Sequence, residues 1–203
     1  KDKPGDHGGG GNSERGKFVV PPGEHPRLVF TKSDIPDIRA RAATPRGELL
    51  VKRLRRSAFG HRERFLKKLE EGDPAWIEDV KTGSRRHLND IQEKCKAAAL
   101  LSIATGDEKS GWAARRLFQI WLSTFPEPSE IEPSGTWGYI EWALAYDWIY
   151  DRLSEEERVK AQAVFASSVN ESAMNMWESA WWLDGPRVNG RNVTNWTMIC
   201  VAA

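Results

Sequence analysis

Helical segments of two kinds alternate in the second half of the chain, and this alternation restricts the fold more than any other feature. The segment that begins at Arg85 carries one apolar stripe and then becomes apolar on nearly every face, which predicts a helix covered on all sides. The segment after Asp107 is amphipathic, and residues 137–150 are again nearly all apolar. Segments of the apolar kind begin near 87, 137 and 192, a repeat of about 50 residues. Layers of inner and outer helices require this pattern, so we predict an all-α fold, an incomplete (α/α) toroid.

Local signals divide the N-terminal half. Residues 1–24 are rich in Gly, Pro and charge and read as a disordered or linker-like tail, so residues 25–203 form the predicted toroid part, truncated at its end. An extended piece, HPRLVFT, precedes Ser33, a predicted N-cap with Pro36 in the first turn of a short helix. Thr44 before Pro45 starts a kinked or broken helix pair around Gly60. A short turn is predicted at residues 75–80.

Capping residues also mark the later helices. Gly106 is a predicted C-cap, and Asp107 is the N-cap of the amphipathic helix. Ser154 and Glu157 form a capping box that starts a long helix with a Trp- and Met-rich end, reaching Trp182.

Charge and composition exclude several classes of function. Lys and Arg total 30 against 29 Asp and Glu, and this balance argues against an overall electrostatic attraction to nucleic acid or to a membrane surface. Residues 39–68 hold eleven Lys or Arg against two acids, and this local charge is either a solvated helix face or a docking surface for an anionic polymer. No apolar run has the length of a membrane span, and no signal peptide is visible, although a mature secreted chain would have lost one.

Cysteine, histidine and tryptophan give weaker indications. Cys95 and Cys200 lack metal-ligand spacing and read as core residues, with a disulfide as the alternative. His7, His25 and His61 have no partner at metal spacing, so no metal site and no cofactor are predicted. The ten Trp are an excess that suits either core packing or stacking on sugar rings.

Four stretches resemble the N-terminal toroid of the heparinase II/III-like and alginate-lyase-like polysaccharide lyases. They are HPRLVFTKSDIPDIRARA, AAALLSIATGDEKSGWAARRLFQIWL, EWALAYDWIYDRLSEEER and NVTNWTMIC, and together they cover roughly residues 25 to 203. The resemblance implies an exported (secreted or periplasmic) bacterial enzyme that cleaves a uronic-acid-containing polysaccharide by β-elimination. It also implies the remainder of the toroid and a β-sandwich domain as further parts of the protein.

The chemistry of that reaction identifies candidate residues in the last stretch. Elimination across C4 and C5 of a uronate needs a neutralised carboxylate, a base and an acid. The resemblance implies that Asn195 neutralises the carboxylate, since an Asn at the start of an inner helix does so in these families. Trp196 stands where many members carry His, so it is assigned to stacking or packing. The base and the acid would lie beyond Ala203, and the chain as given would be catalytically incomplete.

Further residues are candidate contacts to an acidic polysaccharide or oligosaccharide. Asn192 lies three residues before Asn195, on the same face of a helix, and Arg191 precedes it at the mouth. The other candidates lie in loops or at the starts of inner helices: Arg187, Trp137, Tyr139 and His87. Each also has an ordinary structural interpretation as a turn, capping or core residue.

Two alternatives stay open. A toroid glycoside hydrolase would depend on acids, yet the Glu141, Asp147 and Asp151 pattern of YIEWALAYDWIYD reads better as helix packing ended by a polar turn. A non-catalytic helical scaffold or glycan-binding domain would use its Trp residues for the core.

Overall fold

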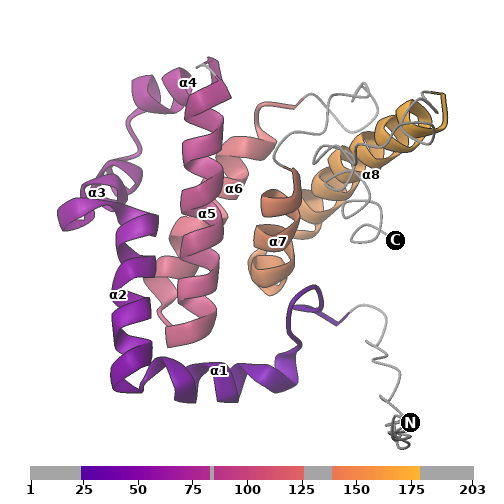
Figure 1. The fold of residues 1–203 in the computed structure, drawn as a ribbon. Helices are drawn as coiled ribbons and strands as arrows, with labels where there is room; N and C mark the ends of the chain where they lie inside the picture. Colours follow the sequence, from indigo (N-terminus) through magenta and orange to yellow (C-terminus); the bar gives the residue numbers. More distant parts are fainter. Residues whose placement is uncertain (1–23, 83–84, 126–138, 179–203) are drawn as a thin grey trace, which may run out of the picture.

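A computed structural model describes residues 24–82, 85–125 and 139–178, and within these ranges every regular element is a helix (Figure 1). The all-α prediction is therefore confirmed. The α-helices are α1 (Ile35–Ala42), α2 (Pro45–Phe59), α3 (Arg64–Glu71), α4 (Pro74–Thr82), α5 (Arg85–Thr105), α6 (Glu108–Leu122), α7 (Tyr139–Ile149) and α8 (Glu155–Glu178). Short 3-10 turns lie at Lys32–Asp34, His61–Glu63 and Tyr150–Arg152.

Helices α5 and α7 lie side by side and run in the same direction. Gln92, the eighth residue of α5, donates a hydrogen bond to Glu141 in the first turn of α7. Just past the end of α7, Arg152 reaches Ser102 in the last turn of α5 and Glu108 of α6. Helices α6 and α8 return in the opposite direction, since Glu157, in the first turn of α8, meets Arg115 and Gln119 in the middle of α6. From α5 to α8 the helices thus alternate in direction, whereas the toroid arrangement stays a prediction.

The helix with the largest buried share is not one of those that the sequence predicts to be covered on all sides. Nine of the fifteen residues of α6 are buried, although its charge pattern predicts a helix with a wet side. Arg115, Arg116 and Gln119 are half-buried. Glu157 of α8 pairs with Arg115 and Gln119 on that face, and Arg116 donates a hydrogen bond to Gln119. The apolar helix α7 buries Trp142 and Ala145 but leaves Leu144 half-buried.

Aromatic rings fill the centre of the core. Trp121 of α6 stacks on Trp142 of α7 with ring centroids 4.6 Å apart, and Phe118 lies 5.1 Å from Trp121. Phe165 of α8 contacts both Trp121 and Tyr146. Part of the tryptophan excess is therefore core packing, while Trp112 of α6 is 43% exposed.

Most predicted capping residues hold their helix ends. Thr44 accepts a hydrogen bond from Gly47 N–H at 3.1 Å, and Asp107 accepts one from Lys109 N–H. Gly106 has φ +72°, a conformation that favours glycine. The Ser154–Glu157 capping box is present, with Ser154 N–H donating to Glu157 Oε2 at 2.6 Å.

The prediction that Ser33 caps the first helix is wrong. Ser33 lies inside the 3-10 turn, and Thr31 and Asp34 form the reciprocal cap instead, with Thr31 N–H donating to Asp34 Oδ2 at 2.8 Å. The aspartate is the stronger acceptor because it is charged. The predicted break between two helices is confirmed at Gly60, which has φ +71°. The predicted short turn at 75–80 is a helix, α4.

Arginines reach the carboxyl ends of both α5 and α7. Arg39 of α1 donates from Nε to the Ile103 carbonyl oxygen at 3.1 Å. Arg158 of α8 donates from Nη2 to the Tyr150 carbonyl oxygen at 3.0 Å, and its guanidinium lies over the Tyr150 ring. These bonds satisfy carbonyl groups that a helix end leaves without partners.

Candidate functional site

Two of the sequence-predicted site residues lie on the described backbone, each near the start of a helix. His87 is the third residue of α5, and Tyr139 is the first residue of α7. Because α5 and α7 run in the same direction, both begin toward the same side of the molecule, but the first turn of α7 lies beside Gln92, seven residues after the start of α5. Figure 1 shows α4 next to the start of α5, which extends beyond the start of α7. The other predicted residues lie outside the described residues: Trp137, Arg187, Arg191, Asn192, Asn195 and Trp196.

A polar pair lies between α5 and α7, at the level of the first turn of α7. Gln92 Nε2 donates to Glu141 Oε2 at 2.7 Å. Gln92 is 6% exposed, whereas Glu141 is half-buried. A carboxylate oriented by an amide keeps further acceptor capacity, so Glu141 has the chemistry to accept a hydrogen bond from a hydroxyl group.

A second polar cluster, at the opposite end of α7, was not predicted. Asp147 is 2% exposed and accepts a hydrogen bond from His25 Nδ1 at 2.6 Å. Its oxygens also accept from the N–H groups of Arg27 at 2.9 Å and Leu28 at 3.1 Å. This aspartate therefore fixes the HPRL segment against α7, although some 120 residues separate the two in the sequence.

Aromatic side chains enclose the histidine of this cluster. The His25 ring stacks on Tyr150 with centroids 3.8 Å apart and meets Tyr146 edge-on. Burial raises the pKa of Tyr146 to about 12, although Gln162 donates a hydrogen bond to its hydroxyl. With His25 only 8% exposed, we interpret the cluster as a structural latch between the N-terminal segment and α7.

A signal for the latch was available in the sequence. An aspartate inside the apolar run WALAYDWIY must be buried, and buried charges are paired or hydrogen-bonded. The pattern does not say which residue supplies the partner. The two stretches joined by the latch, HPRL and the one that contains YDWIYD, are both among those that carry the family resemblance.

Comparisons with protein-family models, with curated protein sequences and with solved structures find no match. The fold defines the class, an all-α protein.

The described residues contain no group of three or more His, Cys, Asp or Glu that is suited to hold a metal ion. No helix among them is long and apolar enough to cross a membrane.

Proposed function

We propose that the protein processes an acidic polysaccharide and binds it at the end of the layer where α5 and α7 begin. The observation that supports this most is the parallel course of the two helices, because both then begin toward the same side of the molecule, with His87 near the start of α5 and Tyr139 at the start of α7. Trp137 lies two residues before α7 in the sequence, so a third candidate is close in sequence to the start of that helix.

The proposed reaction is β-elimination at a uronate by an exported enzyme. Asn195 hydrogen-bonds the C6 carboxylate, which makes the C5 proton removable. A base takes that proton, the bond between C4 and the leaving oxygen breaks, an acid protonates that oxygen, and a C4–C5 double bond forms. Arg187, Arg191, Asn192 and Trp196 contribute to substrate binding. The remainder of a toroid and a β-sandwich domain complete the proposed enzyme.

The test is an elimination assay with the full-length protein. A panel of uronate polysaccharides is incubated with it, and the absorbance of the unsaturated product is followed. We expect a rise with at least one polymer and its loss in Asn195→Ala. No rise with any polymer would overturn the proposal.

Glycoside hydrolysis is the second candidate, and Glu141 is the observation that favours it. Its carboxylate lies between α5 and α7, in the first turn of α7, and is oriented by Gln92. Asn195→Ala and Glu141→Gln separate the two reactions, because hydrolysis should fail in the second variant and elimination in the first. Release of reducing ends without the unsaturated product would favour hydrolysis. Retention on immobilised acidic glycan without either product would favour a binding domain.

A further inference from the structure

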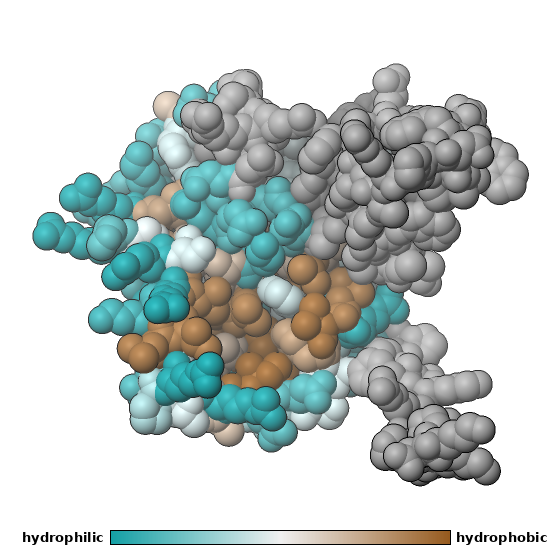
Figure 2. All heavy atoms as spheres, viewed as in Figure 1, coloured by the Kyte–Doolittle hydropathy of each residue, from teal (hydrophilic) through white to brown (hydrophobic). Residues whose placement is uncertain are grey.

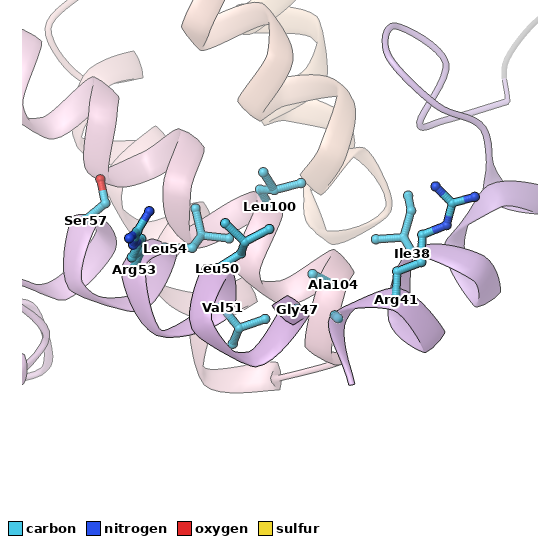
Figure 3. Close-up of a pocket in the computed structure, with 11 residues that line it drawn as sticks. Ile38, Arg41, Gly47, Leu50, Val51, Arg53, Leu54, Ser57, Leu100 and Ala104 are labelled. Atoms are coloured by element: carbon cyan, nitrogen blue, oxygen red, sulfur yellow. The ribbon is translucent and has the colours of Figure 1, made fainter. Parts of the chain in front are cut away.

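An apolar groove lies on another part of the molecule, between α1, α2 and α5 (Figure 3). It has a volume of about 580 Å³. Three helices contribute to its lining, which is mostly apolar: Ile38, Ala42, Leu50, Leu54, Leu100 and Ala104. Figure 2 shows the apolar surface of this region bordered by hydrophilic residues.

The groove follows α2 and leaves large side chains in contact with solvent. Leu50 is 57% exposed, and Leu54 lies one turn further along the same helix. In Figure 3 both side chains extend into the same space as Leu100 of α5 and Ile38 of α1. An open apolar surface that polar residues surround is typical of a site for another macromolecule.

Basic side chains stand at both ends of this apolar row. Arg53 lies at one end and Arg41 at the other (Figure 3). Both are exposed, and neither forms an ion pair within the described part of the chain, where Arg55 takes the acidic partners Glu63 and Asp107. The groove thus combines apolar contacts along its length with two cations that are free to pair.

We propose that the groove binds an amphipathic, acidic helix of a partner protein. The lining along α2 extends from Gly47 to Ser57, about 15 Å at 1.5 Å per residue, which corresponds to roughly three turns of a bound helix. Apolar side chains at positions i, i+4 and i+7 of that helix fill the groove, and its acidic residues pair with Arg41 and Arg53. This site is separate from the proposed glycan site, so each can fail without the other.

Two other occupants fit less well. A second copy of the chain would bring two basic faces together, which like-charge repulsion opposes. An acidic polysaccharide would match the arginines but would leave the leucines without a partner, because no aromatic ring for sugar stacking lines the groove.

The test is a fluorescence anisotropy titration with labelled helical peptides. One peptide carries Leu at i, i+4 and i+7 with Glu on its other faces, and a second carries Lys in place of Glu. We expect the Glu peptide to bind and the Lys peptide to bind at least tenfold more weakly. The affinity of the Glu peptide should fall as salt rises.

Matched variants locate the binding. Leu50→Ser should weaken the Glu peptide at least tenfold, whereas Leu49→Ser, also on α2 and 64% exposed but outside the groove, should not. Arg53→Glu should weaken it more than Lys52→Glu does. The charge variants keep the test valid if Leu50→Ser changes folding, which circular dichroism checks. Absent binding of the Glu peptide, equal effects of the paired variants, or displacement by an acidic oligosaccharide that depends on Arg53 but not on Leu50 would overturn the proposal.

Discussion

The two halves of the described chain are stabilised in different ways. From α5 to α8, helix faces are buried against one another, and the ion pair between Arg115 and Glu157 connects α6 with α8. The first helices also pack on α5 but bury fewer side chains, and α2 fully buries only residues near its ends, at Gly47, Ala58 and Phe59. The difference teaches that the second half is held by widely distributed burial, whereas in the first half single contacts at the latch and at the corner between α1 and α2 carry more of the stability. Substitutions at those contacts test this distinction.

We expect the largest effect from the contact that joins the N-terminal segment to α7. Asp147→Ala would leave His25 and two backbone N–H groups without their acceptor. Because unsatisfied buried donors are costly, we expect the free energy of unfolding to fall by about 3 to 5 kcal/mol. Chemical denaturation measures it.

The control for Asp147 lies one turn further along. Asp151 is 63% exposed and pairs with Lys32, also at the surface, so Asp151→Ala should leave the unfolding midpoint nearly unchanged. Equal effects of the two substitutions would show that the latch does not stabilise the fold.

The corner between α1 and α2 should give the next largest effect. A methyl group added at Gly47 would collide with the backbone carbonyl oxygens of Arg41 and Ala42, which cannot move aside easily. We expect Gly47→Ala to cost about 2 to 3 kcal/mol in a thermal or denaturant melt.

Gly111 of α6 provides the comparison in the second half. There the added methyl would displace only the guanidinium of Arg152, and alanine favours the helix by about 1 kcal/mol. Gly111→Ala should therefore lie within about 1 kcal/mol of the parent chain. A larger loss at Gly111 than at Gly47 would reverse the comparison.

A smaller, pH-dependent effect is expected at Glu157. Burial raises its pKa, but hydrogen bonds from Gln119, the Ser154 N–H and Arg115 outweigh burial and hold it below 4.5. Its contribution is therefore present above about pH 4.5 and is lost as pH falls through the lower pKa of the folded state. Glu157→Gln should cost about 1 to 2 kcal/mol at pH 7 and less in acid, measured by denaturation at several pH values. If the difference from the parent chain did not shrink below pH 4.5, this assignment would be wrong; Glu156→Gln, at an exposed neighbour, is the control.

The smallest effect should come from the groove. Leu50→Ala removes a side chain that is 57% exposed, so we expect a change within about 0.5 kcal/mol. Leu117→Ala, at a fully buried position of α6, should cost about 3 kcal/mol by the same measurement. A large loss at Leu50 would mean that the groove serves folding rather than binding.

Local chemistry explains what could be predicted from the sequence. The caps at Thr44, Asp107 and Ser154 and the break at Gly60 depend on residues within a few positions of each other, so the sequence shows them directly. The latch at Asp147 could not be assigned in the same way, because its partners lie some 120 residues away.

Tertiary contacts also changed the interpretation of single helices. The charged face of α6 matches a solvent-facing pattern, and only the position of α8 shows that Glu157 covers it. For the candidate site, the repeat predicts that His87 and Tyr139 lie near the starts of helices, and α5 and α7 do begin there. That these are inner helices of a toroid stays a prediction. The prediction for Asn195 and its neighbours concerns residues outside the described ranges.

The parallel course of α5 and α7 also has an electrostatic consequence. Peptide dipoles add along each helix and leave about half a positive charge at its start and half a negative charge at its end. Arg39 and Arg158 meet the negative ends through the carbonyl oxygens of Ile103 and Tyr150. Both positive ends point to the other side of the layer, where α5 extends past the start of α7. That side therefore carries a local field that favours anions, even though the net charge of the chain is only +1.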